Sequence, residues 1–289
     1  MDLDSLLSSD VGIEPGQFLE QKYLGLLFGL RHINSRAEEL LYDEVDLERP
    51  HLRAHVRLDR DRAQLSLDLA GRSLHRRGYR TETGPAPLKE NLAAGLIRLS
   101  GWDGQSPLVD PCCGSGVLLI EAALMALQKA PGLHRPFALE GWADFRPELW
   151  EQEQNRAQKR RRGDLNLPPL IGFEEDPLIA DQARANVEAA GLKGVINISN
   201  GSFTQQQLPE GPGVLVCNPP YGQRIGDEQE LDALYGALGQ FVRQEASGWQ
   251  LWLLSGNPKL TGALRLKASR RIPVSNGGID CRWLQYEIR

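Results

Sequence analysis

One segment, from Leu108 to Leu127, constrains the fold of this chain more than any other. The short apolar stretch Leu108-Val109 leads into Asp110-Pro111-Cys112-Cys113-Gly114-Ser115-Gly116, and an apolar segment begins at Val117. This order predicts a strand, a glycine turn and a helix. The two glycines let the backbone approach a ligand closely, and the helix start behind them offers unpaired N–H groups. From Gly84 onward, strands and helices are expected to alternate, which predicts an α/β domain.

The glycine turn indicates which ligands the domain can bind. It contains Gly114 and Gly116 but lacks the third glycine of a dinucleotide fingerprint and the lysine of a Walker loop. An acid, Asp110, stands at its head. The pattern therefore favours a cationic or zwitterionic ligand over a polyphosphate, and Asp110 is the candidate to hold an ammonium group.

Three acids follow the next expected strand, which runs from Leu170 to Phe173. The first, Glu174, is well placed at the strand end to bind the ribose hydroxyls of a nucleoside cofactor. Asp176 stands just before Pro177, and an acid followed by a proline marks a helix start. We therefore expect Asp176 to cap a helix from Pro177 to Ala190, and Glu175 to face solvent.

The tetrapeptide Asn218-Pro219-Pro220-Tyr221 follows a further apolar strand, Val214 to Cys217. Two successive prolines have fixed φ angles and no N–H, so the carbonyls of Asn218 and Pro219 stay free to accept hydrogen bonds. The Asn218 side chain adds an acceptor, and the Tyr221 ring can stack on a planar group. The tetrapeptide indicates a site that grips an exocyclic amine; a plain strand with a Pro-Pro turn is the alternative.

These three motifs, in this order, resemble class I S-adenosylmethionine-dependent methyltransferases of the NPPY type, which methylate exocyclic amines of bases or a protein glutamine amide. Residues 74–80, 86–94 and 130–135 narrow the likeness to guanine-N2 methyltransferases of large-subunit ribosomal RNA. Over residues 45–289 the chain is similar to the first methyltransferase module of the RlmL type, which lies behind a THUMP domain. The resemblance implies a Rossmann-like mixed sheet whose last strand is antiparallel.

The resemblance also implies S-adenosylmethionine as the methyl donor and assigns site residues by position. The expected catalytic residues are Asn218, Pro219, Pro220 and Tyr221. The expected cofactor-binding residues are Leu88, Asp110, Cys112, Gly114, Gly116, Glu174, Ser202, Phe203 and Asn218. Many relatives carry an Asp at the position of Ser202 to accept from the adenine amino group, and a hydroxyl accepts less strongly than a carboxylate. Phe203 either flanks the adenine ring or belongs to the core.

Two domains are expected: a small α+β appendage at residues 1–80 that resembles part of a THUMP domain, and the methyltransferase domain at residues 81–289. Alternating apolar residues on both sides of Asp59-Arg60-Asp61-Arg62 predict a hairpin. Before it, Ser35 to Tyr42 is expected to be helical, with Ser35 as the cap. Helix followed by hairpin resembles the C-terminal half of a THUMP domain, although the family carries a longer region here.

Charge is unevenly distributed along the chain. The net charge is −5, which by itself argues against nucleic-acid binding. However, residues 49–80 contain nine arginines and three aspartates, and such a basic segment is a plausible footprint for phosphates. The expected RNA-binding residues are Arg72, Arg76, Arg77, Tyr79 and Arg80. A well-solvated hairpin surface is the alternative interpretation.

Several further elements are expected. An insertion at residues 129–169 holds a predicted helix from Pro147 to Arg162, whose acidic start and basic end complement the helix dipole; RNA contact by its basic end is the alternative. The other predictions are helices from Leu88 to Ser100, from Val117 to Leu127, from Glu228 to Glu245 and near Leu260, and strands at Val195 to Ile198, at Gln250 to Leu254 and on both sides of Asn276-Gly277-Gly278.

Other sequence features limit the class of protein. The four cysteines form no CxxC pair, so they predict no metal site and are typical of small buried residues in a reducing compartment. The chain lacks an apolar run of about 18 residues, and its first ten residues are acidic, so we expect neither a membrane span nor a signal peptide. A cytoplasmic location is therefore expected.

The expected reaction is methyl transfer from S-adenosylmethionine to the exocyclic N2 of a guanine in 23S ribosomal RNA. The alternatives are methylation of tRNA guanine N2, adenine N6 or a protein glutamine N5, because the NPPY tetrapeptide serves all these amines. A non-catalytic RNA-binding protein that keeps the fold is a further alternative. A nicotinamide-dependent oxidoreductase is disfavoured because the third glycine is missing.

Overall fold

A computed structural model describes residues 53–59, 62–80, 88–133, 135–142, 144–163, 166–221 and 228–289. It divides them into two compact units. The smaller unit takes in the described residues up to Ser73 together with Pro136–Pro147, and the larger unit contains Leu74–Arg135 and Glu148–Arg289. The predicted helix from Ser35 to Tyr42 and residues 81–87 lie outside the described residues.

The larger unit is built on a seven-stranded sheet with the order β5-β4-β3-β6-β7-β9-β8. Its strands are β3 (Leu108–Asp110), β4 (Leu170–Glu174), β5 (Ile196–Asn200), β6 (Val214–Cys217), β7 (Gln250–Ser255), β8 (Arg270–Asn276) and β9 (Ile279–Glu287). The first five strands of the order are parallel, whereas β9 is antiparallel to both β7 and β8. The expected mixed sheet with an antiparallel last strand is confirmed.

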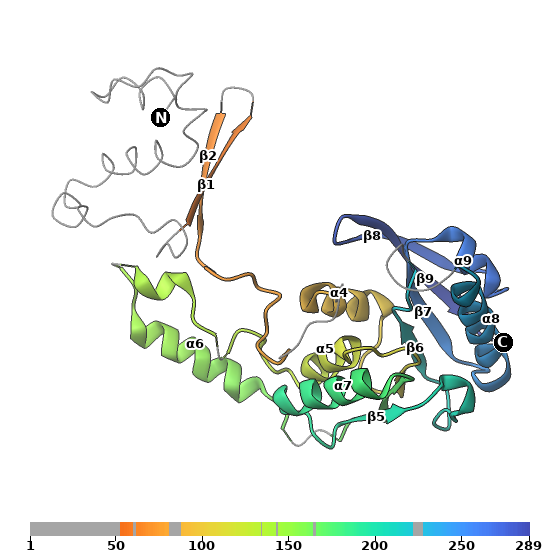
Figure 1. The fold of residues 1–289 in the computed structure, drawn as a ribbon. Helices are drawn as coiled ribbons and strands as arrows, with labels where there is room; N and C mark the ends of the chain where they lie inside the picture. Colours follow the sequence, from red (N-terminus) through yellow and green to blue (C-terminus); the bar gives the residue numbers. More distant parts are fainter. Residues whose placement is uncertain are drawn as a thin grey trace. The chain divides into compact units, whose positions relative to one another are not determined.

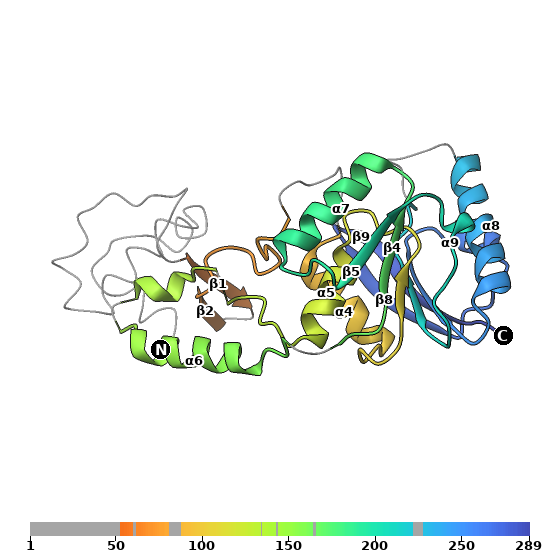
Figure 2. The same cartoon turned by 90° about the horizontal axis from the view of Figure 1, so that it is seen from below.

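Helices cover both faces of this sheet (Figures 1 and 2). One face carries α4 (Glu90–Ser100), α5 (Val117–Ala126) and α7 (Pro177–Ala189), and the other carries α8 (Glu228–Glu245) and α9 (Pro258–Ala263). Side chains of β7 alternate between two core clusters: Trp252 packs in one and Leu251 and Leu253 in the other, because successive strand residues point to opposite faces. Trp252 stacks on Trp283 with ring centroids 5.7 Å apart. These two cores hold the sheet rigid beneath its carboxyl edge.

The observed elements lie close to the expected ones, with shifts at their ends. The strand expected at Val195 to Ile198 runs instead over Ile196–Asn200, because it pairs with β4 up to Glu174 and Asn200. Helix α4 begins at Glu90, since Lys89 is extended and forms the N-cap. Helix α6 (Pro147–Arg160) ends two residues earlier than expected.

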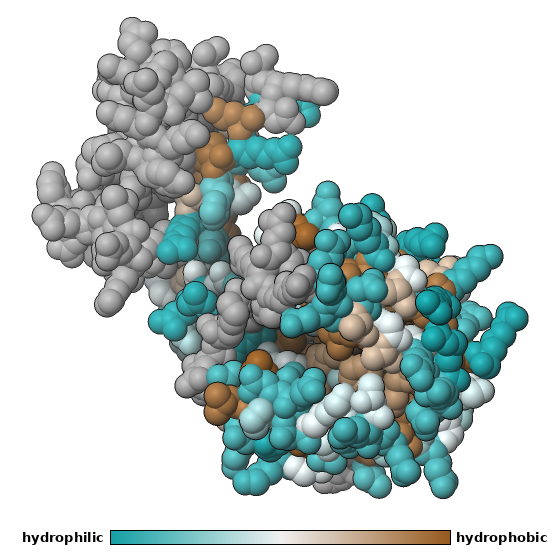
Figure 3. Space-filling model, turned by 45° about the vertical axis from the view of Figure 1, so that its right-hand side comes forward, coloured by the Kyte–Doolittle hydropathy of each residue, from teal (hydrophilic) through white to brown (hydrophobic). Residues whose placement is uncertain are grey.

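The smaller unit contains an antiparallel hairpin of β1 (Arg53–Asp59) and β2 (Arg62–Asp68), as the alternating pattern predicted. Leu69 follows the end of β2, and its carbonyl accepts a hydrogen bond from Leu139 N of the short 3-10 helix Ala138–Gly141. Leu58 and Leu65 are each more than 40% exposed, and hydrophobic and hydrophilic side chains lie next to each other on the hairpin in Figure 3. The likeness to a THUMP domain stays a prediction, because residues 1–52 lie outside the described part of the chain.

Candidate active site

The glycine turn after β3 is held against the neighbouring strand β4. Cys113 N donates to the Phe173 carbonyl at 2.9 Å, and Gly114 N donates to Glu174 Oε2 at 3.0 Å. A Cβ on Gly172 would lie 2.8 Å from Cys113 Sγ, so the thiol occupies the space that a side chain at this position would need. The turn therefore depends on a glycine in β4 as well as on its own glycines.

Gly114 and Gly116 have different roles in the turn. Both have positive φ angles, +51° and +78°, which favour glycine. Gly116 is the N-cap of α5 and its position faces Ala183, whereas a Cβ on Gly114 would find nothing within 4 Å. The backbone at Gly114 is thus open to a ligand, in agreement with the close approach that the sequence suggested.

Asp110 ends β3 and is buried, with 2% of its surface exposed. Its Oδ1 accepts a hydrogen bond from Cys112 N at 3.2 Å. Burial raises the pKa of this carboxyl to about 8, and the nearby Glu174 carboxylate adds to the rise. A buried acid with a raised pKa is stabilised as a carboxylate when a cation binds beside it, so Asp110 suits an ammonium group.

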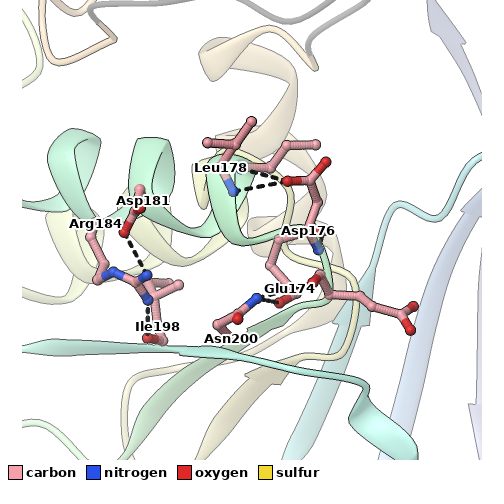
Figure 4. Close-up of polar contacts among 9 residues, drawn as sticks. Glu174, Asp176, Leu178, Asp181, Arg184, Ile198 and Asn200 are labelled. Carbon is pink, nitrogen blue, oxygen red and sulfur yellow. Dashed lines mark hydrogen bonds and ion pairs between the residues drawn. The ribbon is translucent and has the colours of Figure 1, made fainter.

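Glu174 lies at the carboxyl end of β4 (Figure 4). Besides the contact with Gly114, its Oε1 accepts from Asp176 N at 3.1 Å. Asn200 Nδ2 donates to the backbone carbonyls of Glu174 and Glu175, and thereby ties the end of β5 to the end of β4. Each carboxylate oxygen can accept a further hydrogen bond, so the side chain is oriented but can still bind a ligand.

Asp176 caps helix α7 as predicted. Its Oδ1 accepts from Leu178 N at 2.8 Å and from Ile179 N at 3.4 Å, and Pro177 occupies the first helical position. The cap fixes the turn that carries Glu174, which Figure 4 shows between α7 and the strand ends.

Asn218, at the end of β6, has an unusual side chain. Its Oδ1 is buried and, within the described part of the chain, has no hydrogen-bond partner, although the residue as a whole is only half-buried. A buried acceptor without a donor is costly. Its position after the strand, next to the buried Pro219, makes this oxygen a candidate acceptor for a ligand N–H group.

Tyr221 is fixed by the hairpin of β8 and β9. Its hydroxyl oxygen accepts from Asn276 Nδ2 at 2.7 Å, and the Cys281 thiol donates to it at 3.6 Å. A Cβ on Gly256 would lie 3.3 Å from two ring carbons, so the ring packs over the chain just after β7. Burial raises the pKa of Tyr221 to about 12. Sequence reasoning treated Asn276 as part of a turn and missed this contact, which only the fold creates.

The two motifs meet at one edge of the sheet. Strand β3 pairs in parallel with β6, so Asp110 and Asn218 both lie at or beyond the carboxyl ends of neighbouring strands. Cys112 lies against Cys217, and burial and this neighbour raise the pKa of the Cys217 thiol well above its usual value. The glycine turn, Glu174 and the NPPY tetrapeptide are therefore brought together.

Three other predicted site residues, Leu88, Ser202 and Phe203, pack in the core or next to it. Leu88 and Phe203 are 3% and 5% exposed, and Phe203 packs edge-on against Phe241 with centroids 5.4 Å apart. These two side chains therefore belong to the core, which for Phe203 is the alternative that the sequence left open. Ser202 Oγ lies 3.0 Å from Thr204 Oγ1 just outside this core. Cofactor contacts by Leu88, Ser202 and Phe203 stay predictions.

The basic segment also divides into two groups. Arg72 and Arg76 are exposed, as an RNA-binding role requires. Tyr79, in contrast, is 4% exposed and donates its hydroxyl to Glu121 Oε1 at 3.0 Å, while Arg77 Nε lies 3.5 Å from the same oxygen. Buried carboxylates in α4 and α5 need counter-charges, which explains this contact. Of the five residues expected to contact RNA, only Arg72 and Arg76 are exposed.

Arg80 belongs to the same buried group. Its Nη2 donates to the Leu88 carbonyl at 2.9 Å, and its Nε lies 4.0 Å from Glu90 Oε1. Burial raises the pKa of Glu121, and the Arg77 guanidinium and the Tyr79 hydroxyl oppose the rise. These contacts attach the segment before α4 to the two helices that cover the sheet.

Among the described residues, no helix is long and apolar enough to cross a membrane. Within the same part of the chain, no group of three or more His, Cys, Asp or Glu side chains is arranged to bind a metal.

Comparison with known proteins gives consistent matches. Residues 77–285 match the model of the RMKL-like methyltransferase domain. The chain is 44% identical over 254 residues to the ribosomal RNA large subunit methyltransferase K/L of Syntrophotalea carbinolica, and 41% identical over 252 residues to that of Marinomonas sp.. These alignments cover 84% of this chain but only 36% and 35% of the relatives, so the chain spans about a third of their length.

A solved structure shows the same fold. The crystal structure of SMU.472, a methyltransferase by its description and complexed with SAH, superimposes with a TM-score of 0.80 at 31% sequence identity. The match covers 91% of this chain and 68% of that one. The larger unit is thus a class I methyltransferase fold.

Proposed function

Because the chain belongs to the RMKL-like methyltransferase-domain family, we propose that it transfers the methyl group of S-adenosylmethionine to the exocyclic N2 of a guanine in large-subunit ribosomal RNA. The names of the curated relatives support the RNA class, and the sequence segments that resemble guanine-N2 enzymes support the atom. The observation that carries the proposal is the buried Oδ1 of Asn218, which has no partner among the described residues and lies at the edge where the glycine turn also ends.

The residues around the glycine turn fit the methyl donor. S-adenosylmethionine, when bound, supplies an electrophilic methyl group on a sulfonium. The Asp110 carboxyl, buried and with a raised pKa, would hold the donor's ammonium group. Glu174 would accept hydrogen bonds from the ribose hydroxyls, and the open backbone at Gly114 allows a close approach. Holding the donor in line with the amine contributes to rate by proximity.

The NPPY tetrapeptide would act on the amine. A guanine N2 lone pair is delocalised into the ring and is a poor nucleophile, so the site must favour the geometry in which positive charge develops. Asn218 Oδ1 and the Pro219 carbonyl would accept hydrogen bonds from the two amino N–H groups as this charge grows. These hydrogen bonds would stabilise the transition state electrostatically. One of the amino protons leaves to solvent after transfer. No general base is needed before attack.

Tyr221 would present the base to these acceptors. A base inside folded RNA must leave its stack before reaction, and an aromatic ring can receive it. The Asn276 and Cys281 contacts hold the Tyr221 hydroxyl, so that the ring keeps one orientation in the absence of substrate. The expected cytoplasmic location agrees with a ribosomal RNA substrate.

Methyl transfer can be tested with tritiated S-adenosylmethionine and with rRNA and tRNA from cells that lack the protein. We expect label in rRNA, recovered as N2-methylguanosine by mass spectrometry. Label in N6-methyladenosine, in tRNA or in protein glutamine contradicts the assigned substrate. Because the chain spans about a third of the curated relatives, the assay includes a full-length relative as the positive control.

Asn218→Ala tests the assigned acceptor. Loss of a comparable electrostatic contact costs about 10²- to 10³-fold in turnover, and we expect that loss here with little change in S-adenosylmethionine affinity by calorimetry. Turnover close to that of the unmodified chain would show that Asn218 does not grip the amine.

A further inference from the structure

We propose that the cavity between α4 and the turn of the β8–β9 hairpin binds an unpaired nucleotide of the RNA next to the target base. The cavity has a volume of about 540 Å³, and its lining among the described residues comes from α4, the residue before it and the β8–β9 hairpin. Volumes of about 300–1,000 Å³ are typical of sites for small organic ligands. The inference rests on the proposed function, because it identifies a second contact for the same RNA.

The wall formed by α4 is apolar. Leu92, Leu96 and Leu99 line the cavity, and Leu99 is 40% exposed. Gly95 lies among them and presents no side chain. An apolar surface of this kind suits the face of a nucleobase, since unstacked RNA bases are received on flat surfaces of proteins.

The lining of the cavity also includes polar groups. Lys89 and Asn91 contribute an ammonium and an amide from the start of α4, and Ser275 and Asn276 contribute a hydroxyl and an amide from the hairpin. Amides and hydroxyls can pair with the edge of a base, and an ammonium can pair with a phosphate. Among the described residues that line the cavity, none carries a carboxylate, which favours a phosphate there.

Asn276 connects the cavity to the NPPY tetrapeptide. Its Nδ2 donates to the Tyr221 hydroxyl at 2.7 Å, and the same residue lines the cavity. An Asn amide has two N–H donors and one carbonyl oxygen, so one N–H and the oxygen remain for a ligand. Only the Asn276 side chain would therefore separate a nucleotide bound in the cavity from the Tyr221 ring, which receives the target base.

The strand register places the cavity at the same edge of the sheet. Strand β9 runs antiparallel to β7, with Arg282 opposite Ser255, so the turn at Gly277-Gly278 extends beyond the carboxyl end of β7. Asn218 follows the carboxyl end of the adjacent strand β6. The φ angles of Gly277 and Gly278, +60° and +86°, allow the tight turn that forms this wall.

Gly95 gives a direct way to fill the cavity. A Cβ on Gly95 would meet none of the described residues within 4 Å, so Gly95→Trp can project its ring into the space without a clash at the described backbone. Gly95→Ala is the matched control at the same position. Gly236 in α8, where a Cβ also meets nothing within 4 Å, provides Gly236→Trp as a control for a tryptophan on a helix outside the cavity.

The measurements are the KM for rRNA, the turnover at saturating rRNA and the S-adenosylmethionine Kd by calorimetry. Losing one base contact costs about tenfold or more in affinity, so Gly95→Trp should raise the KM for rRNA about tenfold and leave the donor Kd unchanged. Both controls should keep the KM of the unmodified chain. An unchanged KM in Gly95→Trp overturns the proposal, and so does a raised donor Kd, because the cavity would then belong to the donor.

Ultraviolet crosslinking of rRNA to the unmodified chain tests the same contact without relying on turnover. Trypsin releases residues 90–98, which contain most of the α4 wall, and residues 272–282, which contain the hairpin wall. We expect nucleotide adducts on both peptides, and their absence from both, with adducts elsewhere, overturns the inference. If the unmodified chain transfers no methyl group but forms these adducts, the proposed function fails while the nucleotide site stands.

Discussion

Arg77 provides the sharpest test of how the basic segment is used. We consider Arg77→Met, which removes the charge and keeps most of the side-chain length. In the folded chain, the Arg77 and Glu121 side chains are 14% and 3% exposed, and Nε lies 3.5 Å from Oε1. The substitution leaves Glu121 buried with the Tyr79 hydroxyl as its hydrogen-bond donor.

The expected cost follows from these contacts. Removing one partner of a buried ion pair typically costs about 3–5 kcal/mol. The separation is long for an ion pair and Tyr79 remains in place, so we expect a cost at or just below the bottom of this range, about 2–3 kcal/mol. For a domain of this size each kcal/mol lowers the melting temperature by about 2–4 °C, which gives a drop of roughly 5–10 °C.

The sign of the pH dependence is also fixed. Burial raises the pKa of Glu121 above its value in the unfolded chain, and the Arg77 guanidinium opposes this rise. A carboxyl with a raised pKa favours the folded state below the unfolded pKa, and this contribution is lost as the pH rises through the folded pKa. Without Arg77 the pKa of Glu121 rises further. The loss of folding stability in Arg77→Met should therefore be small at acidic pH and largest above neutrality.

Thermal unfolding measured by circular dichroism across this pH range is the assay. Arg76→Met is the matched control, because Arg76 is the exposed neighbour in sequence and its loss should leave the melting temperature unchanged. Arg77→Met combined with Glu121→Gln should recover most of the loss, since the neutral amide can still accept from Tyr79. If Arg77→Met keeps its melting temperature and instead weakens rRNA binding, the buried pair is not structural and the reasoning is refuted.

Two further predictions concern the glycine turn. Gly172→Ala places a Cβ 2.8 Å from both Cys113 Sγ and Ile198 Cδ1, so we expect a loss of about 1–3 kcal/mol in denaturant unfolding and weaker S-adenosylmethionine binding; unchanged unfolding contradicts the packing. Burial raises the pKa of Asp110 from 3.8 to about 8, so its contribution to stability is present below the unfolded value and is lost as the pH rises to about 8. Binding of an ammonium group should therefore release a proton near pH 6.5. Calorimetry in phosphate and Tris buffers should give different apparent enthalpies for the unmodified chain and equal ones for Asp110→Asn; equal values for both proteins contradict the role of Asp110.

Local pattern was sufficient to predict most of the fold. The strand, glycine turn and helix around Gly114 and the cap at Asp176 follow from residues that are close in sequence, and the structure shows them. Element ends were less predictable: β5 continues to Asn200 because its partner strand continues to Glu174. A strand end is set by pairing, and the pairing partner lies elsewhere in the chain.

The environment of individual side chains was harder to predict. The basic segment led us to expect that Arg77, Tyr79 and Arg80 face RNA, but Tyr79 is buried and both arginines are partly buried. Contacts with Glu90 and Glu121 hold the three side chains beside α4 and α5. Glu121 stands within an apolar helix sequence, where a single acid gives little indication of its partner. Its counter-charge comes from 44 residues earlier in the chain, at Arg77.

The sequence by itself determined the alternating α/β order and the three motifs at strand ends, because turn, cap and strand signals act over a few neighbouring residues. Only the tertiary structure decided which side chains meet. It seats the Cys113 thiol over Gly172, gives Asn218 Oδ1 no donor from the described part of the chain and joins Tyr221 to Asn276. These contacts link segments that are far apart in the chain, and the burial and charge that they create arise only when the sheet and its helices pack together.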